Sequence, residues 1–365
     1  MRILMFGMSS YPGGIENYIV NYFCNQQFSS ENKIDFVIYE NDIAYKEKIL
    51  ECGYGIKYVP HLKKNPIAYR KVVKKLLKKD YDCVYINMLS AANKLPVVLA
   101  QKSGIEKIIL HAHSNSTVQG VVRHILHYMN KNYCDRIATK RLTCSHDAAS
   151  WIFNFDNKNN KIVTVPNAID VSKYKFSENF RNEIRKKYRI GDNEFVLGSV
   201  GRLGPEKNNG FMIDILKCLL DKDISAKLLL VGDGTQKEFL IEKAKKMDIY
   251  DSVIFAGTII NPYKYYSAFD AFLFPSQFEG FGIAALEAQS SGLRCYCSDT
   301  LSSELNISKT LQYLDLKEGS ECWSETIISD YKQGKLDPEI LNSSVAKSDY
   351  NIQRQIERIK KILYE

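Results

Sequence analysis

Short apolar segments alternate with segments of helical length along almost the whole chain, and this alternation limits the fold more than any other feature. The apolar segments have the length of strands and are rich in valine, isoleucine and tyrosine. Such alternation is typical of a parallel, doubly wound sheet. The predicted strands cover residues 2–7, 33–39, 56–60, 82–88, 107–113, 141–145 and 161–167 in the first half, and residues 194–201, 226–234, 252–258, 270–276 and 293–299 in the second.

The pattern divides the chain into two α/β domains. We expect the boundary near residues 166–177, where VPNAID leads into a polar segment before a helix at 181–188. The predicted domains are residues 1–170 and 171–348. The final stretch, residues 349–365, repeats isoleucine at helical spacing and predicts an amphipathic helix. Helices of the second domain are expected near Asn208–Leu220, Lys237–Met247 and Gly282–Ser291.

Composition excludes several classes of protein. With 365 residues, 45% hydrophobic and 25% charged, the chain has the composition of a soluble globular protein. No apolar run approaches the ~20 residues of a membrane helix, and the N-terminus has the pattern of a strand, so we expect a cytoplasmic protein. Nine cysteines without a CxxC pair argue against a disulfide scaffold or a zinc site. A net charge of +8 suits anionic partners but does not by itself indicate nucleic-acid binding.

Residues 274–292 place two glutamates in unusual settings. Glu279 lies in a glycine-flanked loop, and Glu287 lies on a following helix that has almost no charged face. A buried carboxylate needs a partner, and no basic residue lies nearby in sequence, so hydroxyls of a ligand are one candidate. The backbone N–H groups of Phe281, Gly282 and Ile283 open the helix, an arrangement that suits a phosphate. The alternative is a solvated Glu279 and a salt-bridged Glu287.

Two further motifs follow predicted strands and suit phosphate groups. In YPGGIE, Gly13 and Gly14 open the first helix and permit close approach of a diphosphate to the backbone. In GRLGPEKN, Arg202 and Lys207 come after the first strand of the second half, where cations neutralise a diphosphate. Neither cation helps the following helix, because cations stabilise helices at their C-termini.

Histidines end the strand at residues 107–113. His111 and His113 are two positions apart and therefore share one side of the strand, which is a spacing seen in metal sites. No third ligand is evident in the sequence. The alternative interpretation is a surface histidine whose ring nitrogens are hydrogen-bonded and have no functional role.

Two other segments have a structural and a functional interpretation. Asp80-Tyr-Asp82 has the form of a metal-binding DxD motif, but it precedes a strand. Ligands of open parallel sheets bind beyond the carboxyl ends of the strands, so the motif lies at the wrong end. We therefore interpret it as a turn. Residues 63–79 form a basic helix with an apolar stripe; the stripe predicts packing in the core, and the charge leaves open contact with an anionic membrane surface.

Glu279 and Glu287, eight positions apart in FEGFGIAALEA, resemble the E-x7-E motif of retaining glycosyltransferases with the GT-B fold. The similarity is greatest to the large glycosyl transferases group 1 family, which includes bacterial capsule and exopolysaccharide transferases. The GR-x-x-x-EK-N pattern of residues 201–208 also matches this family. The resemblance implies two facing Rossmann-like domains, an acceptor-binding domain at 1–170 and a donor-binding domain at 171–348, with helix 349–365 crossing back to the first.

The resemblance also implies residue roles. Glu287 binds the ribose hydroxyls, Glu279 contacts the donor sugar and its oxocarbenium-like transition state, and Arg202 and Lys207 take the departing diphosphate. His113, with His111 as the alternative, lies near the reacting carbon. Contacts with donor or acceptor are further implied at Gly13, Gly14, Gly232, Ile259, Phe281, Gly282 and Ile283.

From these observations we predict a retaining hexosyltransferase that moves a sugar from a nucleotide-sugar donor, with a UDP-sugar favoured, to a hydroxyl of a glycan. We expect this glycan to be lipid-linked and to be used in surface polysaccharide synthesis. The resemblance implies no metal and no other cofactor, and no nucleic acid as partner. One alternative is a nucleotide-sugar 2-epimerase, which shares the architecture but needs no acceptor. The other is a catalytically silent accessory subunit that binds nucleotide sugar.

Overall fold

The computed structural model describes residues 1–365 except 12, 40–41, 115–119, 155–160, 280 and 335. Pro12 and Gly280, which belong to motifs discussed above, lie outside the described residues. The chain forms two compact units, residues 1–167 with 352–365, and residues 168–351. The C-terminal helix thus returns to the first unit, as predicted. Within the described part of the chain, every helix is too short or too polar to span a bilayer.

The first unit is a seven-stranded parallel sheet with the strand order β3-β2-β1-β4-β5-β6-β7. Every predicted strand of the first half is present. The strands are β1 (Arg2–Phe6), β2 (Lys33–Ile38), β3 (Gly55–Tyr58), β4 (Cys83–Met88), β5 (Lys107–Ala112), β6 (Lys140–Thr143) and β7 (Ile162–Thr164). The helices are α1 (Gly14–Phe23), α2 (Gln26–Ser29), α3 (Lys46–Glu51), α4 (Pro66–Leu77), α5 (Leu95–Lys102), α6 (Val121–Ile137), α7 (His146–Ile152) and α15 (Ile352–Tyr364).

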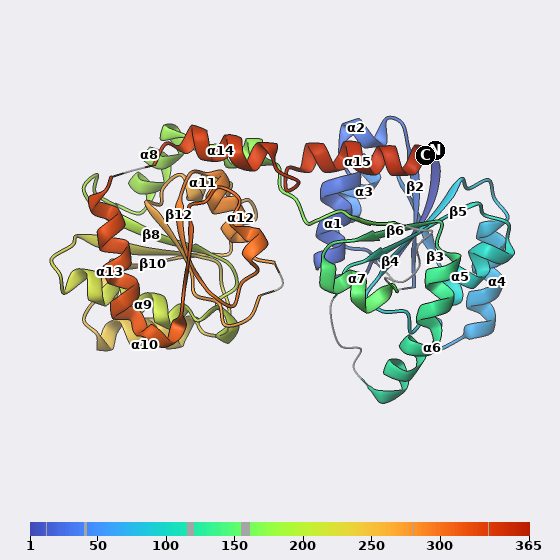
Figure 1. The fold of residues 1–365 in the computed structure, drawn as a ribbon, viewed down its shortest axis with the longest axis horizontal. Coiled ribbons are helices and arrows are strands. Elements are labelled where there is room, and N and C mark those ends of the chain that lie inside the picture. The colour runs from blue at the N-terminus through green and yellow to red at the C-terminus, as the bar shows by residue number, and fades with distance from the viewer. Residues whose placement is uncertain (12, 40–41, 115–119, 155–160, 280, 335) are drawn as a thin grey trace. The chain divides into compact units, whose positions relative to one another are not determined.

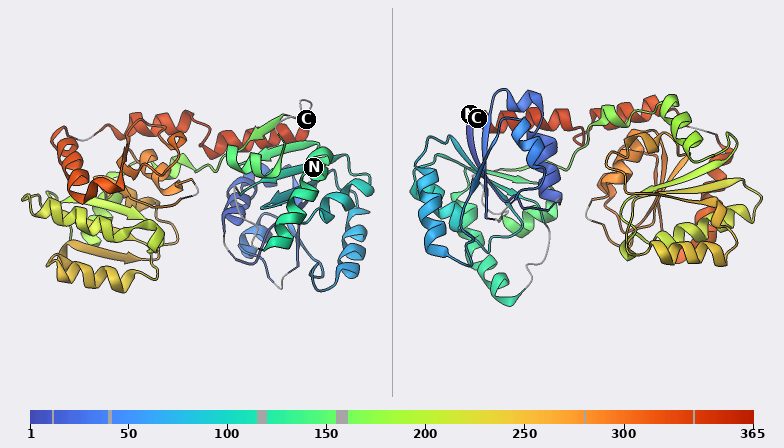
Figure 2. Two further views of the ribbon diagram at one scale, coloured as in Figure 1. Left: turned by 60° about the horizontal axis from the view of Figure 1, so that its bottom comes forward. Right: turned by 180° about the vertical axis from the view of Figure 1, so that it is seen from behind.

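Helices cover both faces of this sheet (Figures 1 and 2). Helix α15 packs on α1 through its isoleucine stripe, because Ile352, Ile356, Ile359 and Ile362 are all buried. Lys360 forms an ion pair with Glu31 at 3.2 Å. The amphipathic pattern of the last residues therefore closes the first unit's core.

The second unit is a six-stranded parallel sheet with the order β10-β9-β8-β11-β12-β13. The strands are β8 (Phe195–Val200), β9 (Ala226–Val231), β10 (Val253–Gly257), β11 (Ala271–Phe274), β12 (Arg294–Ser298) and β13 (Leu311–Leu314). The α-helices are α8 (Glu178–Lys187), α9 (Asn209–Leu220), α10 (Lys237–Lys246), α11 (Tyr263–Tyr266), α12 (Ile283–Ser290), α13 (Gly319–Lys332) and α14 (Pro338–Lys347). Strand β13 was not predicted.

Two apolar clusters hold the helices to the two faces of the second sheet. One cluster joins α8, α11, α12 and α14 to one face, and the other joins α9, α10 and α13 to the opposite face. Figure 1 shows the same two layers. Helix α12 packs within the first cluster through Ala285, Leu286 and Ala288, which agrees with its nearly uncharged sequence.

Candidate functional site

Two charged side chains meet at the carboxyl edge of the second sheet. Lys207 ends the 3-10 turn η2 (Pro205–Lys207) after β8, and Glu279 lies between β11 and α12. Strands β8 and β11 are neighbours, and the chain order reverses between them, which is where open parallel sheets bind ligands. The Lys207 ammonium forms an ion pair with the Glu279 carboxylate and lies 4.9 Å from the centre of the Phe274 ring. The structure therefore brings these two predicted residues together.

Arg202 follows β8 at the same edge, but its partner is a different carboxylate. Its guanidinium forms an ion pair with Glu206 at 2.6 Å, and the Arg202 side chain is 74% exposed. The Glu206 carbonyl accepts a hydrogen bond from the backbone N–H of Gln277 at 2.9 Å. This bond joins the β8–α9 and β11–α12 connections, so that Arg202, Lys207 and Glu279 belong to one small region.

The start of α12 depends on a glycine. Gly282 is the N-cap residue and has φ +89°, a left-handed conformation that favours glycine. A Cβ at this position would lie 3.1 Å from Leu305 and 3.3 Å from the Phe274 ring. Phe281 beside it stacks on Tyr350, with ring centres 5.0 Å apart. Gly282 offers no side chain to cap the first N–H groups of the helix, which suits an anionic ligand at Ile283.

Glu287 has two protein partners that the sequence analysis missed. The hydroxyl of Tyr174 donates to one carboxylate oxygen at 2.7 Å, and the hydroxyl of Tyr266 donates to the other. Burial raises the pKa of Glu287 above its ordinary value, and the two tyrosine hydrogen bonds oppose the rise. Ligand hydroxyls are therefore not the sole means of satisfying this carboxylate. Four lone-pair sites leave it able to accept further hydrogen bonds.

No sequence signal links these tyrosines to Glu287 directly. Tyr174 ends the 3-10 turn η1 (Val171–Tyr174), and Tyr266 ends α11, so the three residues come from three separate elements. The tyrosine-rich segment YKYY at 263–266 is the one hint, since a buried phenol needs a hydrogen-bond partner.

Gly232 allows two loops to touch. It has φ +143°, and a Cβ there would lie 1.9 Å from the Gly201 carbonyl oxygen. Gly201 donates its N–H to the Val231 carbonyl at 2.9 Å, and Leu203 donates to the Asp233 carbonyl at 3.0 Å. A glycine at position 232 is therefore required for the connection after β9 to contact the connection after β8. Contact of Gly232 with a nucleoside stays a prediction.

Ile259 lies after β10 at the same edge of the sheet, and its side chain packs partly buried against the core. Its neighbour Ile260 is 91% exposed. The predicted contact at Ile259 involves backbone atoms, and it stays a prediction too.

A carboxylate occupies the glycine loop of the first unit. Glu16 is buried, and its Oε1 accepts a hydrogen bond from the Ser9 N–H at 2.9 Å. Its Oε2 lies only 2.8 Å from where a Cβ on Gly13 would be, so Gly13 makes room for this side chain, whereas a Cβ on Gly14 would meet open space. A carboxylate here repels a diphosphate and favours hydroxyl groups. The donor diphosphate and the acceptor were both predicted as ligands of this loop, and the geometry favours the acceptor.

The two histidines differ in exposure. Their rings are 4.0 Å apart, as expected for one side of a strand. His111 is fully buried beneath Tyr85, whose hydroxyl lies 2.7 Å from Nδ1, whereas His113 is only partly buried. His113 Nε2 donates to the side-chain oxygen of Asn87 at 2.8 Å, because an amide oxygen only accepts. His113 is therefore the better candidate for contact with a ligand.

Burial keeps both histidines neutral. It lowers the pKa of His113 to about 3 and lowers the pKa of His111 well below its ordinary value, with the neighbouring ring adding to the second effect. A neutral imidazole at pH 7 can donate and accept hydrogen bonds, but it is a weak base. Among the described residues, no three histidine, cysteine, aspartate or glutamate side chains are grouped to hold a metal ion.

The segments with two interpretations take structural positions. Asp82 accepts a hydrogen bond from the Arg2 N–H at 2.6 Å, and Tyr81 donates to Asp35 at 2.6 Å, both where β4 begins. The interpretation of this motif as a turn is confirmed. Helix α4 buries Tyr69, Val73 and Leu77 in the core of the first unit, and its basic side chains are exposed.

A cavity lies elsewhere, among described residues of the second unit. It has a volume of about 840 Å³ and is lined by Phe195, Ala271 and Arg294, the residues that begin β8, β11 and β12. This is the amino edge of the second sheet, opposite the predicted site. No residue of the predicted site lines this cavity.

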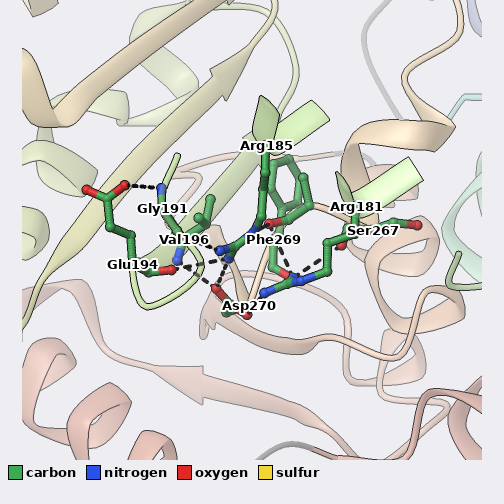
Figure 3. Close-up of polar contacts among 9 residues, drawn as sticks. Arg181, Arg185, Gly191, Glu194, Val196, Ser267, Phe269 and Asp270 are labelled. Carbon is green, nitrogen blue, oxygen red and sulfur yellow. Dashed lines mark hydrogen bonds and ion pairs between the residues drawn. The ribbon is translucent and has the colours of Figure 1, made fainter. Parts of the chain in front are cut away.

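Buried charges beside this cavity serve the fold. Asp270 accepts from Arg181 at 2.8 Å, from Arg185 at 2.5 Å and from the Val196 N–H at 2.9 Å (Figure 3). Arg185 also donates to the Gly191 carbonyl at 3.0 Å. Since both guanidinium groups are paired, the cluster ties α8 to the beginning of β8 and leaves no free cation for a ligand.

The chain is similar to known glycosyltransferases. Residues 180–307 match the family model "Glycosyl transferases group 1". A putative glycosyltransferase, EpsF of Bacillus subtilis, is 26% identical over 97% of this chain and 94% of its own length. The UDP-Gal:alpha-D-GlcNAc-diphosphoundecaprenol alpha-1,3-galactosyltransferase of Escherichia coli is 28% identical over 62% of this chain and 60% of its own length.

The fold is also similar to that of a solved structure. Anabaena HepE in complex with UDP matches the whole of both chains with a TM-score of 0.79 at 17% identity. Two parallel α/β units, a C-terminal helix that returns to the first unit and the matched family region agree with one another. The chain has the GT-B fold, and its residues 180–307 are similar to the group 1 glycosyltransferases.

Proposed function

We propose that this protein is a retaining glycosyltransferase that transfers a hexosyl group from a UDP-sugar to a hydroxyl of a lipid-linked glycan in surface polysaccharide synthesis. The observation that carries the proposal is the meeting of Lys207, Glu279 and the start of α12 at the strand reversal of the second sheet. Residues 1–167 with 352–365 would bind the acceptor, and residues 168–351 the donor.

The chemistry follows from the charges. The diphosphate of the donor would lie against Lys207, Arg202 and the first N–H groups of α12, which together stabilise the negative charge that develops as it leaves. Glu279, held by Lys207, would contact the donor sugar and stabilise the positive charge at its reacting carbon. Glu287 would bind the ribose hydroxyls. The leaving phosphate itself would take the proton of the acceptor hydroxyl.

The two cations supply the positive charge that a metal would otherwise provide at the diphosphate, and we therefore propose that transfer requires no metal or other cofactor. The acceptor would lie near His113 and the loop of Gly13 and Glu16, whose carboxylate favours hydroxyls over phosphates. The names of the relatives support this proposal, because one of them transfers galactose from UDP-galactose to a diphosphoundecaprenol-linked sugar.

The test is release of nucleoside diphosphate from UDP-, GDP- and ADP-sugars, with and without a lipid-linked glycan and in the presence of a chelator. We expect acceptor-dependent release from one UDP-sugar that the chelator leaves unchanged. Glu279→Ala should lower the rate by about 10²–10³-fold, the loss typical of one group that stabilises developing charge. Glu325→Ala is the matched control, since Glu325 is also ion-paired, with Lys222 at 3.3 Å, but lies on α13.

Other outcomes contradict the proposal in distinct ways. Interconversion of the donor sugar without acceptor would indicate a 2-epimerase. Binding of nucleotide without turnover of any donor would indicate an accessory subunit. Full activity in Glu279→Ala would refute the assigned site even if the protein is a transferase, and an inverted anomeric configuration in the product would refute retention.

A further inference from the structure

Tyr45 lies directly before helix α3 in a backbone conformation that a tyrosine rarely adopts. Its φ is +56° and its ψ is +33°, the left-handed region that suits glycine or asparagine and is unfavourable for a bulky side chain. A residue at this position normally has an extended backbone and caps the helix with its side chain, and Tyr45 does neither. The strain therefore gives α3 no cap, and residues strained in this way cluster at functional sites.

Hydrogen bonds fix the Tyr45 ring between two elements of the first unit. Its hydroxyl donates to the side-chain oxygen of Asn17 on α1 at 2.5 Å, yet Tyr45 remains 37% exposed. Next to it, the N–H of Ala44 donates to the Ser9 carbonyl at 3.0 Å, which joins the segment before α3 to the connection after β1. The ring is thus held in one place while part of its surface stays open to a ligand.

The buried carboxylate of Glu16 lies close to this ring. Burial raises the pKa of the Tyr45 phenol above its ordinary value, and the charge of Glu16 adds to the rise. Glu16 is held by the Ser9 N–H, and a side chain at position 13 would press on its Oε2, where Gly13 adds no cover. An exposed aromatic ring and a fixed carboxylate therefore lie side by side in the first unit.

These chemical groups suit a sugar ring. A pyranose has C–H groups on its faces, which pack on an aromatic ring, and hydroxyls at its edge, which donate to carboxylate and amide oxygens. Tyr45 offers the aromatic ring, and Glu16 and Asn17 offer the oxygens. The basic residue that follows, Lys46, is paired with Asp42 at 3.2 Å, so its charge is already balanced. A phosphate would meet the negative charge of Glu16 here, whereas a neutral sugar would not be repelled.

We propose that Tyr45 packs against one sugar ring of the acceptor glycan, whose hydroxyls bind Glu16, and that Tyr45 is a specificity-determining residue for the acceptor. The inference rests on the proposed function and deepens it, because it names the side chains that recognise one sugar unit of the acceptor. The strained backbone then has a use, since the residues that suit it better, glycine and asparagine, have no aromatic ring. Tyr11, in the same connection as Ser9, is 78% exposed and offers a second ring.

Saturation-transfer difference NMR tests the inference without donor or transfer. The probes are the methyl α-glycosides of glucose, galactose and N-acetylglucosamine, each titrated against the full chain. At least one should bind the wild type, and Tyr45→Asn should weaken this binding by roughly tenfold, the loss expected for one aromatic contact. Glu16→Gln should weaken it by about fivefold, because a neutral amide accepts hydrogen bonds less strongly than a carboxylate. Since asparagine suits the left-handed backbone, the thermal midpoint of Tyr45→Asn should change little.

Two further variants separate the ring from the hydrogen bond and from exposure. Tyr45→Phe keeps the ring, loses the bond to Asn17 and should bind within about twofold of the wild type, since the ring contact is retained. Tyr364→Asn on α15 is the matched control, because Tyr364 is also exposed and donates to an asparagine, Asn32, at 3.1 Å. It should bind the glycosides like the wild type.

Three results would overturn the inference. The first is that the wild type binds none of the three glycosides. The second is equal binding by the wild type and Tyr45→Asn, which would show that Tyr45 only ties α3 to α1. The third is an equal loss in Tyr45→Phe and Tyr45→Asn, which would assign the effect to the hydrogen bond and not to the ring. Failure of sugar transfer with glycoside binding retained would refute only the proposed reaction.

Discussion

Tyr266→Phe removes one hydrogen bond from the Glu287 carboxylate and leaves the ring in place. The ring is fully buried against Tyr174, Phe269 and Phe272, so packing should be unchanged. A hydrogen bond to a charged group contributes about 1.5–3 kcal/mol. For a unit of this size, a loss of that amount lowers the thermal midpoint by about 3–12 °C.

The loss of stability in Tyr266→Phe should depend on pH, and the direction of this dependence follows from the pKa of Glu287. Burial raises this pKa above the unfolded value, so ionisation of the group costs stability as pH rises through and above the unfolded pKa. Removing a donor that stabilises the ionised form raises the pKa further. The variant should therefore be most destabilised, relative to wild type, at pH 8, and less so at pH 5, where a larger fraction of the carboxyl groups is protonated.

Differential scanning calorimetry at the two pH values measures this difference. Tyr174→Phe should behave in the same way, because Tyr174 donates to the other carboxylate oxygen. Tyr265→Phe is the control, since the Tyr265 hydroxyl lies beside Lys187 and Tyr188 and not beside Glu287. Equal destabilisation of Tyr266→Phe at pH 5 and pH 8 would refute the reasoning, because it would mean that the hydroxyl supports packing and not the ionised carboxylate.

Three further predictions concern other parts of the chain. Asp270→Ala leaves two buried guanidinium groups without their carboxylate and should cost about 3–5 kcal/mol, visible as a lower calorimetric midpoint; an unchanged midpoint would contradict the structural assignment. Gly232→Ala should destabilise the second unit and weaken binding of UDP in titration calorimetry, because its Cβ would meet the Gly201 carbonyl, whereas Gly210→Ala inside α9 meets nothing closer than 3.5 Å and should be tolerated. His113 has a pKa of about 3 and stays neutral above pH 5, so His113→Ala should lower the transfer rate without changing the shape of its pH profile between pH 5 and 8; the loss of an ionisation in that range would refute this.

Much of the fold follows from local pattern. Strand-length apolar runs and the helices between them are set by residues a few positions apart, and all the predicted strands are present. Strand β13, with the sequence LQYL, escaped prediction because it is short, lies at the edge of the sheet and carries a polar glutamine in the middle. The carboxyl-edge positions of Arg202, Lys207 and Glu279 could also be predicted, because each follows a strand and all strands of the sheet are parallel.

Contacts between distant residues could not be predicted in this way. One example is the ion pair of Lys207 with Glu279, and another is the pair of tyrosine hydrogen bonds to Glu287. These contacts join separate connections, and no repeating pattern in the sequence indicates them. Helix α6 is the clearest case. It exposes Val121, Ile125 and Met129, while His127 and Asn130 on the opposite side form hydrogen bonds inside the unit. The sequence by itself determined where most strands and helices form, because this depends on residues a few positions apart. The tertiary structure decided which side of each helix is buried and which partner each polar side chain has. These depend on groups that only the whole fold brings together.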